Sequence, residues 1–193
     1  MKRLVFLFGI VFAFAIAASA QGLSIGSAME DFSLADTSGK TQSLSSLKGK
    51  NGAVVIFLSA QCPVVRMYNE RINQLASEYA AKGINFIGIN SNVSESPDAV
   101  KGHAELNYRF PMLLDKGSVL ANKLGANVTP EAYYIDAKNV LLYHGAIDND
   151  RTGRSITDTY LKAAFDSSLA GRKVERTTAS AFGCSIKRAG DYN

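Results

Sequence analysis

The organisation of the chain follows from residues 53–83, AVVIFLSAQCPVVRMYNERINQLASEYAAKG. The first six residues are apolar and rich in β-branched side chains, a pattern typical of a strand that is buried on both faces. From Val64 onward, apolar side chains recur every three or four residues, which predicts an amphipathic helix that ends at Lys82-Gly83. Cys62 stands between the two elements, followed by Pro63. Proline suits the first position of a helix because its missing N–H would have no helical partner there.

Cys62 is the first candidate for chemistry. At a helix N-terminus, unpaired amides and the macrodipole favour negative charge, and this lowers the pKa of a thiol. The thiolate is the reactive form of cysteine, so this position makes a redox nucleophile plausible. The alternative is a buried structural thiol.

The N-terminus has the pattern of an export signal. Lys2-Arg3 precedes an apolar run over residues 4–17, and Ala18-Ser19-Ala20 forms a cleavage site of small residues. The run is shorter than the roughly 20 residues that span a bilayer, so we expect no stable membrane anchor after signal cleavage. We therefore expect residues 1–20 to be removed and the protein to be exported, periplasmic or secreted; a retained anchor is the alternative.

Composition narrows the classes of function. The 193 residues are enough for one domain with a proper core. The formal net charge is +4, of which Lys2 and Arg3 supply two, and no basic cluster with interleaved aromatic residues suggests nucleic acid. Cys62 and Cys184 are the only cysteines, so one intramolecular pairing is possible in an oxidising compartment.

The remaining elements predict one α/β domain over residues 21–170. We expect a hairpin from 32–34 and 41–44, one helical turn at 45–49, strands at 84–89, 112–114, 128–136 and 140–144, and helices at 97–107, 119–124 and 156–169. The strand–helix–strand order predicts parallel pairing with a right-handed crossover, within a central mixed sheet. Residues 171–193 form a polar, irregular tail that is long enough for Cys184 to reach Cys62.

Three motifs carry a resemblance to a known family. They are Asp31-Phe32-Ser33-Leu34 with Gly39-Lys40, the strand–Cys62-Pro63–helix unit, and Val128-Thr129-Pro130 before a Tyr-Tyr-Ile-Asp strand. Together they resemble the thioredoxin superfamily and, within it, the redoxin branch of alkyl hydroperoxide reductase/thiol-specific antioxidant proteins. The patterns Cys62-Pro63…Tyr68-Asn69 and Phe182-Gly183-Cys184-Ser185-Ile186-Lys187-Arg188 are similar to an exported peroxiredoxin-like subgroup. The resemblance implies a thioredoxin-like fold, a mixed sheet flanked by helices, with an N-terminal hairpin and an extended C-terminal tail.

The chain departs from both active-site patterns of the superfamily. A thioredoxin site has a second cysteine three residues on, where this chain has Val65. A peroxiredoxin site has a proline and a threonine where this chain has Val55 and Ser59, and an arginine near the position of Pro130. In thioredoxins that proline is cis, lies against the active cysteine, and presents backbone to an extended substrate. The resemblance therefore implies a hybrid site.

The residues expected at the site come from the helix start, the proline loop and the tail: Cys62, Cys184, Pro130, Thr129, Ser59, Gln61 and Arg66. Cys62 is the expected redox nucleophile, and Cys184 its possible resolving partner. Ser59 and Gln61 are candidates to donate hydrogen bonds to the thiolate, and Arg66 to favour the anion. The alternatives are a free Cys184, ordinary loop polar groups and a solvated arginine.

We expect neither a cofactor nor a metal. His103 and His144 are far apart in the sequence and lack the spacing of a metal pair. Residues 148–153 faintly resemble a calcium loop, but its twelfth position is Thr159, and Arg151 opposes a cation.

Three functions stay open at this point. The first is a thiol–disulfide oxidoreductase, in which Cys62 attacks a disulfide, Cys184 resolves the product, and an external dithiol protein exchanges electrons. The second is a peroxidase that uses the same cysteine, with a peroxide in place of an extended disulfide substrate. The third is a non-enzymatic binding module with a structural Cys62–Cys184 bond.

Overall fold

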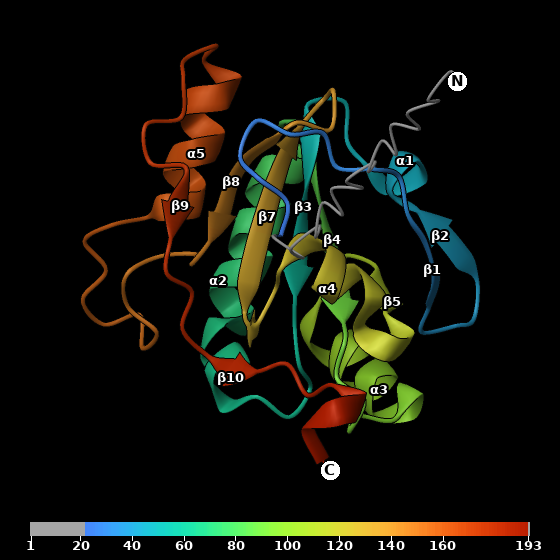
Figure 1. The fold of residues 1–193 in the computed structure, drawn as a ribbon. Helices are drawn as coiled ribbons and strands as arrows, with labels where there is room; N and C mark the ends of the chain where they lie inside the picture. Colours follow the sequence, from blue (N-terminus) through green and yellow to red (C-terminus); the bar gives the residue numbers. More distant parts are fainter. Residues whose placement is uncertain (1–21, 193) are drawn as a thin grey trace, which may run out of the picture.

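The computed structural model describes residues 22–192 (Figure 1). In chain order its strands and α-helices are β1 (Ser33–Asp36), β2 (Thr41–Ser43), α1 (Leu44–Leu47), β3 (Gly52–Phe57), α2 (Pro63–Ala80), β4 (Ile84–Asn90), α3 (Pro97–Asn107), β5 (Met112–Leu114), α4 (Val119–Leu124), β6 (Val128–Thr129), β7 (Glu131–Asp136), β8 (Leu141–Gly145), α5 (Tyr160–Leu169), β9 (Thr178–Ala179) and β10 (Cys184–Ser185). The expected signal peptide lies outside the described residues. Among residues 22–192, no helix combines the length and apolar character needed to cross a membrane.

The sheet is mixed, as the sequence predicts. Its strands run in the orders β2-β1-β5-β4 and β3-β7-β8-β9. β1 and β2 form the expected antiparallel hairpin, β4 pairs with β5 in parallel, and β3 pairs antiparallel with β7. The two halves meet where β3 ends beside β4, with the Leu58 N–H donating to the Ile89 carbonyl at 2.9 Å.

Helices cover both faces of the sheet. Every residue of β3 is buried, and alternate side chains point to opposite faces. Val54 and Ile56 share a core cluster with α2, α3 and α5, whereas Ala53, Val55 and Phe57 share one with α1 and α4. This two-sided burial is why the strand reads as a continuous apolar run rather than an alternating one.

Helix α2 begins where the sequence predicts. Cys62 is its N-cap residue and Pro63 occupies the first turn. Tyr68, Ile72 and Tyr79 of the expected apolar stripe are fully buried, but Val65 rather than Val64 completes the buried face at the N-terminal end. The helix ends at Ala80, and Gly83 takes a positive φ of 81° in the following turn.

Three sequence predictions need correction. The last helix begins at Tyr160 rather than Ile156, because Asn149 accepts the N–H groups of Thr157 and Asp158 and holds them in a loop. The strand expected over residues 128–136 is split at Pro130 into β6 and β7. The tail is not irregular throughout, since β9 pairs with β8 and β10 pairs with β6.

A buried polar cluster fastens the loop after β8 to α2. The Asp148 carboxylate accepts hydrogen bonds from the Tyr68 hydroxyl at 2.8 Å and from Arg71, which forms an ion pair with it at 2.5 Å. The Arg71 guanidinium also lies 3.9 Å from the centre of the Tyr68 ring. Burial and the neighbouring carboxylate raise the pKa of Tyr68, so its hydroxyl stays protonated and remains a donor.

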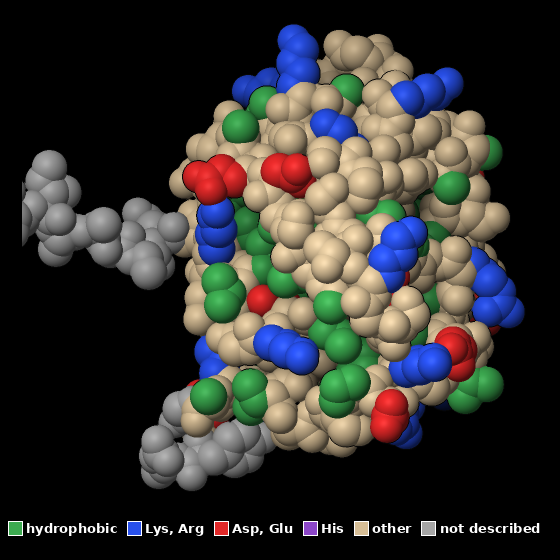
Figure 2. All heavy atoms as spheres, turned by 90° about the vertical axis from the view of Figure 1, so that its right-hand side faces the viewer, with side chains coloured by type: hydrophobic (Ala, Val, Ile, Leu, Met, Phe, Trp, Pro, Cys, Tyr) green, Lys and Arg blue, Asp and Glu red, His purple; other side chains and the backbone are tan. Residues whose placement is uncertain are grey.

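Surface charges do not gather into one patch on the face shown in Figure 2. Lys and Arg side chains are scattered there, with carboxylates among them.

Replacing Asp148 with Asn should therefore destabilise the fold. Asp148→Asn leaves the Arg71 charge without its counter-charge in a site where little water can reach it, and we expect a loss of about 2–4 kcal/mol in the free energy of unfolding. Urea denaturation measures this. The matched control is Glu78→Gln, which breaks an exposed pair with Lys82 and should cost less than about 1 kcal/mol. Equal effects of the two substitutions would contradict the assignment.

Candidate functional site

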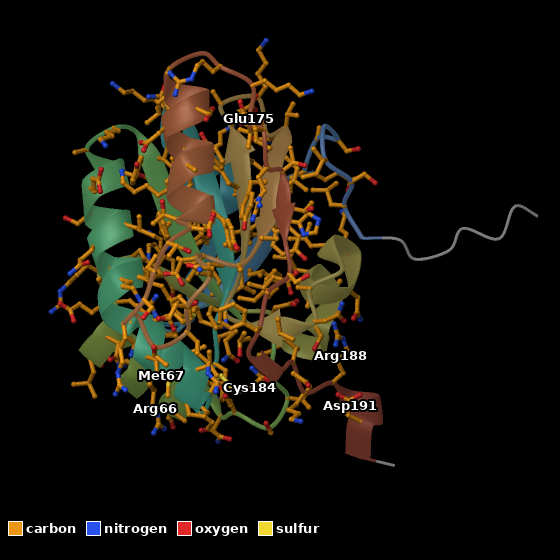
Figure 3. All side chains as sticks on the ribbon, turned by 90° about the vertical axis from the view of Figure 1, so that its left-hand side faces the viewer. Arg66, Met67, Glu175, Cys184, Arg188 and Asp191 are labelled. Atoms are coloured by element: carbon orange, nitrogen blue, oxygen red, sulfur yellow. A yellow bond between two sulfur atoms is a disulfide. The ribbon has the colours of Figure 1, made fainter. Side chains whose placement is uncertain are left out.

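Cys62 and Cys184 are joined in a disulfide, although 122 residues separate them in the sequence. Their Cα atoms are 5.8 Å apart. Cys62 is only 2% exposed, whereas Cys184 is partly exposed. Figure 3 shows Cys184 near Arg66 and Met67, at the end of the molecule where α2 begins. The two cysteine residues therefore differ in their exposure to solvent.

The proline loop lies directly against Cys62. The Thr129–Pro130 peptide bond is cis, the geometry that the resemblance implies. Pairing of β3 with β7 places Phe57 opposite Glu131, so the segments beyond these residues meet at the same end of the sheet. The Cys62 Sγ lies 3.3 Å from the Thr129 carbonyl oxygen. In the reduced protein, a Cys62 thiol would be placed to donate a hydrogen bond to this carbonyl.

A buried carboxylate organises the loop that presents Cys62. Glu95 is 9% exposed and lies in the segment between β4 and α3. It accepts hydrogen bonds from the N–H groups of Ala60 at 3.0 Å and Gln61 at 3.1 Å, from Asn90 Nδ2 at 2.6 Å, and from the Ser59 hydroxyl. Ser59 Oγ in turn accepts the Cys62 N–H at 3.1 Å. Glu95 thus fixes the backbone of the loop from residue 59 to residue 62.

Ser59 and Gln61 lie in the same loop, and Arg66 lies in the first turn of α2. The Ser59 proton is donated to Glu95 rather than to sulfur. Gln61 contributes its backbone N–H to the network, while the residue is otherwise exposed. Arg66 is exposed, and its guanidinium makes a long hydrogen bond of 3.5 Å to the Ala60 carbonyl.

Strand β10 covers the proline loop. Cys184 pairs with Thr129 and Ser185 with Val128 in an antiparallel ladder. The Ile186 N–H extends the ladder with a hydrogen bond of 2.9 Å to the Asn127 carbonyl, and the Ile186 side chain is 1% exposed. The tail therefore occupies the backbone edge that the resemblance assigns to an extended substrate.

Glu95 and Ile186 are not among the site residues that the sequence analysis names. Glu95 stands in the segment Ser94-Glu95-Ser96-Pro97, which signals only a helix cap. Ile186 could have been found, because Phe182, Cys184 and Ile186 alternate with polar or small residues, which is typical of a strand with one buried face.

The arrangement is suited to thiol chemistry. The N-terminus of the 18-residue helix α2 stabilises negative charge on Cys62 once the disulfide is opened. Within residues 22–192, no group of three or more His, Cys, Asp and Glu side chains is placed to hold a metal ion. The site thus brings a disulfide, a helix N-terminus and the cis Thr129–Pro130 bond together.

Comparisons with known proteins give a family match, a distant relative and structures that share the fold. Residues 25–144 match the model of the AhpC/TSA family. The thiol-disulfide oxidoreductase ResA of Bacillus anthracis is 28% identical over 120 residues, which are 62% of this chain and 68% of ResA. A hypothetical protein of Sinorhizobium meliloti is 31% identical in a superposition with a TM-score of 0.80, covering 88% of this chain and 97% of that one. The peroxidoxin BcpB of Mycobacterium tuberculosis shares the fold at 21% identity, with a TM-score of 0.56 and coverage of 76% and 94%.

The Glu95 network makes a prediction about the Cys62 loop. Glu95→Gln replaces one acceptor oxygen by an amide group that faces N–H or O–H donors on either side. We expect a loss of about 1–3 kcal/mol in the free energy of unfolding and faster hydrogen exchange at the amides of residues 60–62. Gln61→Ala removes an exposed side chain and should change stability by less than about 0.5 kcal/mol. Unchanged exchange in Glu95→Gln would show that the loop does not depend on this carboxylate.

Proposed function

The chain belongs to the AhpC/TSA family, and we propose that it is an exported thiol–disulfide oxidoreductase with the Cys62–Cys184 pair as its redox centre. The observation that carries this proposal is the position of the disulfide, between the start of α2 and the cis-proline loop. The distant relationship to ResA, a thiol-disulfide oxidoreductase, supports the same class of reaction. The electron partner is an external dithiol protein.

Reduction of the disulfide begins at Cys184. The residue Cys184 is partly exposed, whereas Cys62 is almost fully covered, so we expect a donor thiolate to attack at Cys184. A bond forms between the donor sulfur and Cys184 Sγ as the Cys62–Cys184 bond breaks, and Cys62 leaves with the electron pair. A leaving thiolate is favoured when its pKa is low, which is the condition that a helix start provides. The second donor thiol then attacks the donor–Cys184 bond, leaving an oxidised donor and two reduced cysteines.

The reduced centre would pass these two electrons to a substrate disulfide. An extended substrate segment takes the backbone edge of Val128 and Thr129 that β10 leaves when the tail is released. The Cys62 thiolate attacks one substrate sulfur, and the other substrate sulfur leaves as a thiolate. Cys184 then attacks Cys62 Sγ, which restores the disulfide and releases the first substrate sulfur as a thiol. Each cycle moves two electrons from the donor to the substrate.

The geometry favours disulfide exchange over peroxide reduction. Ser59 stands at the position of the peroxidase threonine, but its proton is donated to Glu95. Pro130 stands near the position of the peroxidase arginine and supplies no positive charge. A peroxide bound beside Cys62 would therefore lack the two groups that polarise it.

The order of attack can be tested by trapping. A thioredoxin-type donor with a single active-site cysteine should form a mixed disulfide with the oxidised chain at Cys184, because Cys184 is the more exposed of the two cysteine residues. Peptide mapping by mass spectrometry identifies the bonded cysteine. Trapping at Cys62 would contradict the proposed order.

The reduction potential separates a catalytic disulfide from a structural one. We expect equilibration with dithiothreitol to give a potential above about −300 mV, the level below which structural disulfides of exported proteins lie. A lower potential, together with no exchange with the donor, would favour a binding module locked by the bond. Rapid oxidation of reduced Cys62 by hydrogen peroxide would instead favour a peroxidase.

A further inference from the structure

The tail binds to the proline loop as an extended peptide would. Phe182, Cys184 and Ile186 are partly or fully buried, whereas the intervening Gly183 and Ser185 are exposed. Every second side chain of the segment thus faces the domain. The backbone of the segment pairs with Val128 and Thr129, and the Ile186 N–H donates to the Asn127 carbonyl. In such a binding mode, the backbone supplies affinity, and the inward side chains supply specificity.

Close packing at Gly183 excludes every other residue type. A Cβ atom at this position would lie 2.0 Å from the Thr129 carbonyl oxygen and 2.7 Å from the Thr129 carbonyl carbon. These are backbone atoms of the residue before the cis-proline, so they cannot move aside as a flexible side chain could. Glycine before the cysteine is therefore a steric requirement of this edge.

The flanking positions have partners of their own. Two residues before the cysteine, the Phe182 ring lies 6.3 Å from the ring of Tyr68, itself held by Asp148. Two residues after the cysteine, Ile186 is buried in the core cluster that includes α4. Farther on, Arg188 donates to the Asn122 side chain at 2.8 Å, and Figure 3 shows Arg188 beyond Cys184 along the tail.

We propose that residues 182–186 are a built-in ligand of the strand site beside Cys62, and that this site selects extended disulfide substrates with an aromatic residue, glycine, the reacting cysteine, any residue and an aliphatic residue in that order. The inference deepens the proposed function and rests on it. The Cys62–Cys184 bond locks the tail in the site, so a substrate can compete with the tail only after reduction. A substrate that matches the pattern competes with the tail for the same backbone edge.

The selection is tested with a full-length chain that carries Cys184→Ser, in which Cys62 is free. The probe is a synthetic peptide of residues 181–188, AFGCSIKR, with its cysteine in a disulfide with glutathione. Attack of the Cys62 thiolate on the peptide sulfur forms a chain–peptide disulfide and releases glutathione, which is measured over time. A peptide with alanine in place of glycine should react about 10- to 100-fold more slowly, as overpacking of a close contact implies. A peptide with alanine in place of the exposed serine should react at an unchanged rate.

The same glycine should have the opposite effect when it is changed in the chain. Gly183→Ala in the Cys184→Ser background displaces the tail and should speed the reaction of the unaltered peptide by at least about tenfold, because a tethered competitor acts at an effective concentration in the millimolar range. Gly102→Ala in that background is the matched control: it adds the same methyl group in open space on α3 and should leave the rate unchanged. Arg188→Ala loosens the tail without adding a clash, and it should also speed the reaction. Circular dichroism checks that each variant is folded.

The outcomes separate this inference from the function on which it rests. Exchange of Cys62 with glutathione disulfide, combined with equal rates for the glycine and alanine peptides, would overturn the selection and leave the oxidoreductase function intact. An unreactive Cys62 in every folded variant, including Arg188→Ala in the Cys184→Ser background, would overturn both. Opposite effects of the glycine change in the peptide and in the chain would support the built-in ligand.

Discussion

The antiparallel pairing of β3 with β7 is the constraint on which the site depends. With Phe57 opposite Glu131, the five residues after Phe57 and the two before Glu131 must share one end of the sheet. The result is a distance of 3.3 Å between Cys62 Sγ and the Thr129 carbonyl oxygen. Strand register allows no intermediate adjustment, because a shift by one residue turns every side chain of the strand to the other face. The buried side chains of β3 therefore fix the register, and the register brings the cysteine to the proline loop.

In the proposed redox cycle, the Cys62–Cys184 disulfide places stability and turnover in opposition. Closing a loop of 122 residues stabilises the folded chain by about 4–5 kcal/mol in the chain-entropy description. A redox centre must give up this contribution in each cycle without losing its fold. Two features reduce the cost: Cys62 becomes a thiolate at a helix start, and Glu95 holds the Cys62 loop through contacts that do not involve sulfur. Opening the bond therefore destabilises mainly the tail, because the two-residue strands β9 and β10 are what pair it with the domain.

Local patterns in the sequence predict most of the fold, because burial on one or two faces leaves a readable period. They give the strand before Cys62, the helix after it, and the boundaries of α3 and α4. Contacts between segments that are distant in the sequence leave no such period. Glu95 reaches the Cys62 loop across more than thirty residues, and two of the four groups that donate to it are backbone N–H groups, which carry no sequence signal. Likewise, Ile156 has the spacing of a helical residue, but Asn149 binds the adjacent backbone and delays the start of α5.

In the proposed cycle, tethering of the tail determines when a substrate can bind. A segment of the same chain competes at an effective concentration in the millimolar range, even without its covalent bond. A free partner at micromolar concentration would need about a thousandfold greater affinity to displace the tail. The tail already occupies the backbone edge of Val128 and Thr129 and the apolar site of Ile186, from which a partner would gain that affinity. In the oxidised chain the covalent bond adds to this competition, so substrate entry has to follow reduction, after which the substrate competes with the tethered tail alone. On this reasoning the oxidised chain is closed to disulfide substrates, and the state of one sulfur–sulfur bond decides when the strand site is exposed.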